Sequence, residues 1–208
     1  MTHTQRVNRA FKRLSAIALA LAVAAMVSGC AKKPEPIISS GTAAPGDSGY
    51  TYKLTVDPME FNWRAEGGNL HVKMKGPAGV WISVGFNPTK GMKDANFIIG
   101  YVENGKAVVT DQFGTDPKQH RKDTDLGGTD DVKDAAGFEN ANETVITFTL
   151  PLNSGDALDR PISLDSNTVV LFAAGKEKQT AQQHTFWAKA GVNLSTGAYA
   201  VNLIRKAK

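Results

Sequence analysis

The sequence predicts an all-β protein, an antiparallel β-sandwich of about ten strands. Three observations lead to this fold class. After residue 49, apolar and polar residues alternate with a period of two in short runs, which is typical of strands with one buried face. Clusters of Gly, Pro, Asn and Asp separate the runs. No run of any length shows the 3.6-residue apolar period of an amphipathic helix.

The expected strands follow one another along the chain with short turns between them. They are residues 50–56, 60–64, 70–75, 80–86, 97–102, 107–113, 146–150, 168–174, 184–188 and 199–204. Asn104-Gly105 separates two of these runs and is a strong signal for a two-residue hairpin turn. Residues 168–174 are apolar on both faces, so we expect this strand to lie in the middle of a sheet.

Residues 114–142 break the alternation and are expected to form a long polar loop. Loops of this length are usually functional or mobile. Several aspartates, among them Asp116, Asp123, Asp125, Asp130 and Asp131, and the pair Gly127-Gly128 lie in this segment. Its acidic stretch, residues 123–131, could supply oxygen ligands to Ca²⁺. The adjacent Asp130 and Asp131 would point apart, however, which favours a solvated acidic loop.

The N-terminus has the three zones of an export signal followed by a lipid-attachment site. Basic residues between 6 and 13 precede an apolar stretch, residues 14–27, which is shorter than the roughly 20 residues of a membrane span. Val27-Ser28-Gly29-Cys30 follows and looks like a bacterial lipobox. We therefore expect a signal peptide at 1–29, a lipid on Cys30, a flexible tether over 30–49 and one domain over 50–208. The lipid would make the membrane a partner, and Ala31 after the cysteine favours the outer membrane.

Charge and cysteine content exclude several classes of function. The chain has 24 basic and 20 acidic residues, but four basic residues precede Cys30, which leaves 20 against 20 in the mature protein. A chain with no net charge gives no support for nucleic-acid binding. With the single cysteine acylated, no thiolate remains for a disulfide, a blue copper site or a nucleophile. No serine elbow, phosphate loop or zinc-protease motif is present, so we expect no enzyme.

The methionines and histidines lie in different settings. Met74 falls in phase with the apolar face of its strand, and His71 falls on the opposite, lysine-rich face. His120 lies in the polar loop and is expected to be exposed. Met92 lies in a loop punctuated by Gly and Pro, where it either covers the end of the core or brings its thioether to a metal or a flat apolar ligand. His184 opens a strand and is either a structural residue or a ligand.

The chain from Tyr50 to Trp187 resembles the DOMON domain family. The resemblance rests on the order and spacing of several short segments. These are Trp81-Ile82-Ser83-Val84-Gly85-Phe86, Gly91-Met92, residues 95–99, Gly100-Tyr101-Val102, Asp111-Gln112-Phe113, residues 144–152, Asp156, Asp159-Arg160-Pro161-Ile162, residues 169–175 and His184. One position departs from the family pattern, because Leu150 stands where the family usually has an arginine before its Pro-Leu pair.

The resemblance implies an immunoglobulin-like sandwich and a cofactor. In the haem-binding branch, which includes the cytochrome domain of cellobiose dehydrogenase, the Met of the Gly-Met loop and a C-terminal His are the axial ligands of the haem iron. Met92 and His184 match these two positions. The sequence has no Cys-x-x-Cys-His motif, so the haem would be of b type and held non-covalently.

The same resemblance implies electron transfer to a redox partner protein that the sequence does not identify, because both axial positions would be filled. Aromatic residues near the two ligands are candidates for the apolar walls of the site. They are Trp81, Phe86, Phe97, Tyr101 and Phe186. The alternative is a DOMON module without haem that binds a carbohydrate, Ca²⁺ or another protein.

Overall fold

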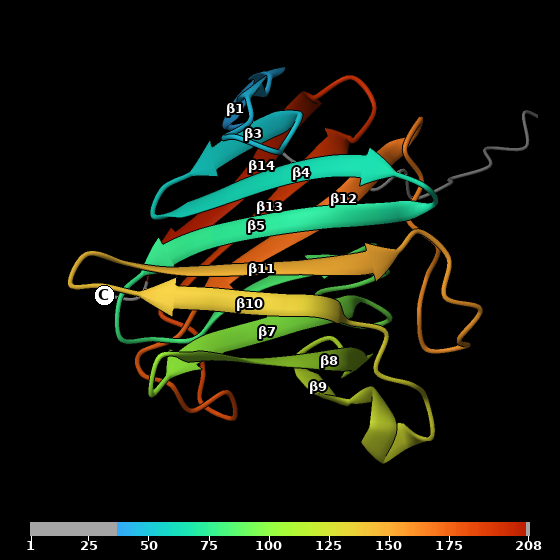
Figure 1. The fold of residues 1–208 in the computed structure, drawn as a ribbon. Coiled ribbons are helices and arrows are strands. Elements are labelled where there is room, and N and C mark those ends of the chain that lie inside the picture. Colours follow the sequence, from blue (N-terminus) through green and yellow to red (C-terminus); the bar gives the residue numbers. More distant parts are fainter. Residues whose placement is uncertain (1–36, 207–208) are drawn as a thin grey trace, which may run out of the picture. The chain divides into compact units, whose positions relative to one another are not determined.

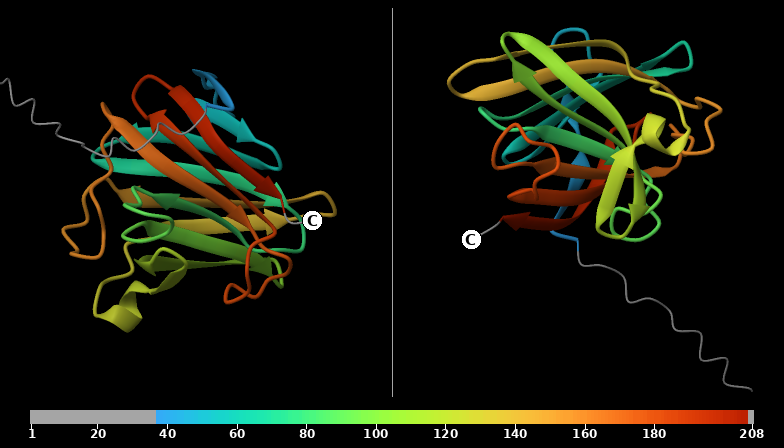
Figure 2. Two further views of the ribbon diagram at one scale, coloured as in Figure 1. Left: turned by 180° about the vertical axis from the view of Figure 1, so that it is seen from behind. Right: turned by 90° about the horizontal axis from the view of Figure 1, so that it is seen from below.

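The computed structural model describes residues 37–206, which fold as two antiparallel β-sheets packed face to face (Figures 1 and 2). The predicted β-sandwich is confirmed. The signal peptide, Cys30 and the first part of the tether lie outside the described residues. Within residues 37–206, no helix is long and apolar enough to cross a membrane. One short 3-10 helix, η1 (Asp123–Leu126), accompanies the strands.

The larger sheet has eight strands. In spatial order they are β1 (Ser39–Thr42), β14 (Ala198–Lys206), β13 (Phe186–Asn193), β12 (Asn167–Ala174), β6 (Ile82–Phe86), β7 (Asn96–Glu103), β8 (Lys106–Asp116) and β9 (Gln119–Lys122). The strand predicted to be central, β12, pairs with β13 on one side and β6 on the other. Asn104 and Gly105 have positive φ values of 51° and 74° in the β7–β8 turn, as the hairpin signal predicts.

The smaller sheet has six strands. In spatial order they are β10 (Lys133–Glu139), β11 (Glu143–Pro151), β5 (Asn69–Pro77), β4 (Met59–Glu66), β3 (Tyr52–Val56) and β2 (Ala44–Pro45). Strand β5 alternates buried and half-buried residues over its whole length, as the period of two in the sequence predicts. The chain passes from the smaller to the larger sheet twice, between β5 and β6 and again between β11 and β12.

Aromatic side chains fill the core between the two sheets. Trp63 and Phe61 are fully buried and stacked, with ring centroids 5.0 Å apart. Phe61 also meets Phe172 of the facing sheet edge-on at 6.0 Å. The indole Nε1 of Trp63 donates a hydrogen bond to the carbonyl of Leu194 at 2.9 Å, so its one polar atom is satisfied in the core. This core holds the two sheets together.

Four edge strands, β1, β2, β9 and β10, lie where the sequence predicts tether or loop. Residues 39–42 pair with β14 as β1, although their composition is that of a tether. The segment predicted as a long polar loop contains β9, η1 and β10. Strands at a sheet edge with few buried residues, such as β10, need no regular apolar alternation. The period of two therefore does not reveal them.

Candidate functional site

The outer face of the larger sheet carries a second apolar cluster, separate from the core. In a two-layer sandwich this face is expected to be polar, because no further sheet covers it. Here five buried side chains form a cluster, and three half-buried ones pack against it. The buried members are Trp81, Ala95, Phe97, Ile99 and Leu171, and the half-buried members are Met92, Tyr101 and Ala173. We call this set the outer cluster.

Strand alternation explains how the outer cluster forms. In β7, Ile98 points into the core, while Phe97 and Ile99 point to the outer face. In β12, Phe172 belongs to the core and Leu171 to the outer cluster. The apolar character of β12 on both faces, which predicts a central strand, therefore also reflects an apolar surface on the outside of the sandwich.

Small side chains leave room for aromatic rings on this face. Across the sheet, Leu171, Gly85 and Phe97 are successive partners on β12, β6 and β7. The ring of Phe97 lies directly over Gly85, and a Cβ at that position would overlap the ring. Glycine is needed here for close approach.

The loop that carries Met92 is fixed against the end of β8 by its backbone. The Met92 N–H donates to the Pro117 carbonyl at 3.1 Å, and the Asp94 N–H donates to the Gly114 carbonyl at 2.7 Å. The Gly114 N–H in turn donates to the Ala95 carbonyl at 2.9 Å. A Cβ at Gly114 would overlap the carbonyl oxygen of Met92, so the close approach of the loop to β8 requires glycine at this position. These contacts hold the thioether of Met92 beside the outer cluster.

Two histidines lie at the rim of the outer cluster. The ring of His120 is 5.4 Å from the ring of Phe97, and its Nδ1 is 2.7 Å from Gln112 Oε1. The ring of His184 is 6.1 Å from that of Trp187. Burial lowers the pKa of both histidines, and the nearby His184 lowers the pKa of His120 further. Both imidazoles are therefore neutral near pH 7, which is the form that binds metals.

The prediction that His120 is exposed is wrong, because the side chain is half-buried. Strand β9 folds back along β8, with Gln112 opposite Lys122 and Phe113 opposite Arg121. This pairing brings His120 onto the outer face. The segment has no strand signal in its sequence, so its place beside Phe97 could not be foreseen.

Two of the predicted wall residues lie elsewhere. Phe86 and Phe186 belong to the core between the sheets, and Phe86 contacts Phe61 with ring centroids 6.3 Å apart. The reason is alternation in β6, where Phe86 has the parity of Val84 and Ile82, both core residues. The structure thus removes Phe86 and Phe186 from the candidate walls.

The other predicted site residues come together on one face. Trp81, Phe97, Tyr101 and Met92 share the outer cluster. His184 lies near it, because its ring is 6.1 Å from that of Trp187, which pairs opposite Ala173 of the cluster. The buried Nε1 of Trp81 has no hydrogen-bond acceptor within the described part of the chain. This buried donor packs against Gly175, where a Cβ would overlap it. The face therefore offers a thioether, two imidazoles and aromatic rings.

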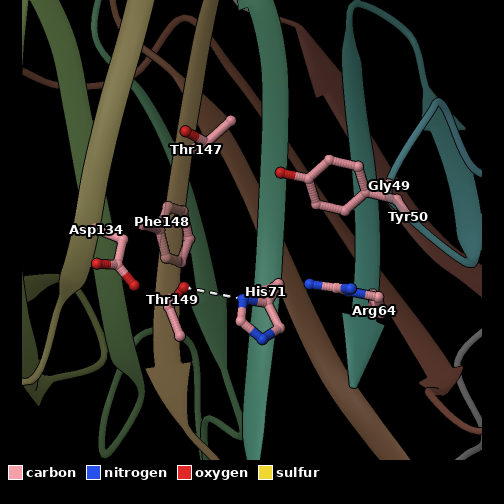
Figure 3. Close-up of a pocket in the computed structure, with 8 residues that line it drawn as sticks. All are labelled: Gly49, Tyr50, Arg64, His71, Asp134, Thr147, Phe148 and Thr149. Carbon is pink, nitrogen blue, oxygen red and sulfur yellow. Dashed lines mark hydrogen bonds between the residues drawn. The ribbon is translucent and has the colours of Figure 1, made fainter. Parts of the chain in front are cut away.

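A separate hollow of about 310 Å³ lies over the outer face of the smaller sheet (Figure 3). Tyr50, Arg64 and His71 line it on one side, and Thr147 and Thr149 line it on the other. His71 Nδ1 is 3.0 Å from the hydroxyl of Thr149. His71 thus lies on the opposite side of the molecule from the outer cluster, as the lysine-rich face of its strand predicts.

Comparison with known proteins identifies relatives of the domain. The DOMON domain family model matches residues 57–175, more than half of the chain. DBH-like monooxygenase protein 1 of Homo sapiens is 29% identical over 138 residues, which are 64% of this chain. The protein of the same name from Mus musculus is 26% identical over 138 residues. The match covers only 22% of each of these relatives, about a fifth of their length.

Two solved structures have a similar fold at low sequence identity. The cytochrome domain of Myriococcum thermophilum cellobiose dehydrogenase is 12% identical with a TM-score of 0.48, covering 82% of this chain and 88% of that one. The cytochrome b domain of pyranose dehydrogenase from Coprinopsis cinerea is 14% identical with a TM-score of 0.46, covering 75% and 78%.

Proposed function

Because the chain belongs to the DOMON domain family, we propose that it binds one b-type haem on the outer face of the larger sheet and transfers electrons. One observation carries the proposal: an apolar cluster with a thioether and two imidazoles on a sheet face that no other layer of the fold covers. A flat apolar ligand with a metal at its centre matches these groups, because the rings and the aliphatic side chains contact its plane while sulfur and nitrogen reach the metal.

The proposed roles follow the chemistry of each side chain. His184 and Met92 would hold the iron, and Trp81, Phe97 and Tyr101 would form the apolar walls. When bound, a haem supplies one-electron redox chemistry. With both the imidazole and the thioether bound, the iron would have no open position for a substrate, which favours electron transfer over catalysis. The sequence lacks a Cys-x-x-Cys-His motif, so the attachment is non-covalent.

An absorption spectrum of the protein purified with haem available tests the proposal. We expect an intense Soret band and the spectrum of a six-coordinate low-spin iron. The variant His184→Ala should lose tight haem retention or become high-spin, since imidazole is the stronger anchor. Met92→Ala should keep haem, lower the reduction potential and let carbon monoxide bind. A wild-type protein that takes up no haem would overturn the proposal.

Two further histidine variants test whether His184 is the histidine that binds the haem iron. His71→Ala is the matched control, because His71 lies on the outer face of the smaller sheet. Its spectrum should equal that of the wild type. His120→Ala should also keep its haem, with at most a small shift of the bands. Loss of haem in the His120 variant together with retention in the His184 variant would transfer the ligand role to His120.

A ligand-binding module without haem is the second candidate, and the hollow in Figure 3 favours it. A tyrosine ring, an arginine and two threonine hydroxyls around an open hollow are groups that bind carbohydrates or other polar ligands. The Nε of Arg64 is buried and lacks an acceptor within residues 37–206. If the wild-type spectrum shows no Soret band, glycan-array binding that is lost in Arg64→Ala would support this function.

We also propose that the protein is anchored to a membrane by a lipid on Cys30, in the outer membrane in preference to the inner. The support is the lipobox and the single cysteine of the sequence. Cys30→Ser should release the protein from the membrane fraction or leave the precursor uncleaved. A variant that still fractionates as a processed membrane protein would disprove the lipid assignment.

A further inference from the structure

Three aspartates from distant parts of the sequence meet at one place in the fold. Asp111 comes from β8, Asp131 from the segment between η1 and β10, and Asp159 from the connection between β11 and β12. One carboxylate oxygen of each lies within 4.8 Å of the others. This acidic cluster is distinct from the outer cluster, because Asp111 pairs opposite the core residue Ile98.

Buried oxygen atoms without donors surround the acidic cluster. Asp111 is 3% exposed, and its Oδ1 has no hydrogen-bond donor among the described residues. The same holds for Oδ1 of Asn96, which is 5% exposed and whose Nδ2 donates to Asp159 at 2.6 Å. Asp123 is completely buried, and neither of its carboxylate oxygens has a donor in this part of the chain. Leaving such acceptors buried and unpaired is unfavourable.

No basic side chain in the described part of the chain forms an ion pair with these carboxylates, which are those of Asp111, Asp123, Asp131 and Asp159. The neighbouring Asp156 has its own donors, since the N–H groups of Thr129 and Leu158 donate to it at 2.6 and 2.8 Å. The unpaired oxygens therefore belong to the inner group of carboxylates. A cation from solution is the partner that would satisfy several of them at once.

We propose that Asp111, Asp131 and Asp159 bind one Ca²⁺ ion, with Asp123 and Asn96 supporting the site. The 4.8 Å span of the three oxygens is about twice the Ca²⁺–oxygen distance of 2.3–2.6 Å, so one ion can contact all three. The ligands are all oxygen, and no cysteine or histidine belongs to the cluster, which disfavours zinc and copper. Several carboxylates from irregular segments suit Ca²⁺ better than Mg²⁺, which keeps most of its water and binds through one or two carboxylates.

A cation here would join segments of both sheets. Asp111 belongs to the larger sheet, and Asp131 leads into β10 at the edge of the smaller one. Asp159 lies where the chain crosses between the two sheets. Binding of Ca²⁺ should therefore stabilise the folded state, because a ligand that binds only the folded protein raises its stability by mass action.

Calorimetric titration of CaCl₂ into the full chain, after EDTA treatment and removal of the chelator, tests the site. We expect one Ca²⁺ per chain and a Ca²⁺-dependent rise in the midpoint of thermal unfolding. Mg²⁺ at tenfold excess should compete poorly. Asp131→Asn and Asp159→Asn should each weaken Ca²⁺ binding by at least about tenfold, since affinity depends on the number of charged ligands. The same measurements apply whether or not the protein holds a haem.

The exposed Asp125 of η1 supplies the matched control. Asp125→Asn removes one acidic charge a few residues away and should leave the affinity unchanged. Circular dichroism of each variant confirms that it is folded. Wild-type protein without saturable Ca²⁺ binding would overturn the proposal. So would unchanged affinity in both the Asp131 and the Asp159 variants, or Mg²⁺ binding as tight as that of Ca²⁺.

Discussion

Replacing Asp111 by asparagine removes a buried charge while keeping the shape of the side chain. Oδ2 of Asp111 accepts a hydrogen bond from the Asp131 N–H at 3.0 Å, and the amide oxygen of asparagine can accept the same bond. The side chain is 3% exposed, so water cannot solvate the carboxylate. Burial, and to a smaller extent the nearby Asp159 and Asp123, raises the pKa of Asp111 from 3.8 to about 8.

The raised pKa makes the stability of the cation-free protein depend on pH. Between pH 3.8 and about 8 the folded state keeps a proton on Asp111 that the unfolded chain has released. Asp111 therefore contributes its full stabilisation of the folded state below the pKa of the unfolded chain, 3.8. This stabilisation is lost as the pH rises through the pKa of the folded state, about 8. Each pH unit within this range lowers the free energy of unfolding by about 1.4 kcal/mol. Asparagine does not titrate. The free energy of unfolding of Asp111→Asn, relative to that of the wild type, should therefore rise by roughly 3 kcal/mol from pH 5 to pH 7.

Urea unfolding of both proteins at pH 5, 6 and 7 in EDTA measures this difference. Subtracting the two curves cancels the effect of His120 and His184, whose lowered pKa values act with the opposite sign and add stability as the pH rises. Asp125→Asn serves as the control and should follow the wild type. A stability difference that stays constant or shrinks between pH 5 and pH 7 would refute the assignment of Asp111 as a buried, protonated acid.

Two further substitutions test the packing that the site depends on. Gly114→Ala places a Cβ against the Met92 carbonyl, so it should destabilise the protein by about 1–3 kcal/mol. In haem-loaded protein it should reproduce the carbon monoxide binding of Met92→Ala, and an unchanged spectrum would argue against a fixed Met92 loop. Trp63→Phe removes the donor to the buried Leu194 carbonyl and should lower the free energy of unfolding by about 1–3 kcal/mol, measured by urea unfolding. A loss below a few tenths of a kcal/mol would show that water replaces this bond.

The strands of the core could be predicted from the sequence because their pattern is local. Residues 70–75 alternate strictly, and the structure buries the predicted face of β5. The Asn104-Gly105 turn and the central position of β12 were likewise predictable, since each depends on a few neighbouring residues. Edge strands such as β1 and β10 are not predictable in this way, because a strand with little buried surface has no apolar period to recognise.

The two candidate sites differ in how much of each the sequence contains. The family pattern selects Met92 and His184 by their positions along the chain, and the apolar outer side of β12 is visible as a strand without a polar face. Only the pairing of β9 with β8 brings His120 to Phe97. Phe86 points into the core because it lies on the same face of β6 as Ile82 and Val84. The position of His120 does not follow from spacing along the chain, and that of Phe86 needs the structure to show which face of β6 is the core.

By itself, the sequence determined the fold class, the central strands and the residue types available for chemistry, because these depend on short-range periodicity and composition. The tertiary structure alone decided which side chains meet. Asp111, Asp131 and Asp159 are separated by 20 and 28 residues, and their carboxylates converge because the middle of β8, the lead into β10 and the connection between β11 and β12 come together in the fold. Contacts of this kind arise from strand pairing and sheet packing over long distances along the chain, which no local pattern records.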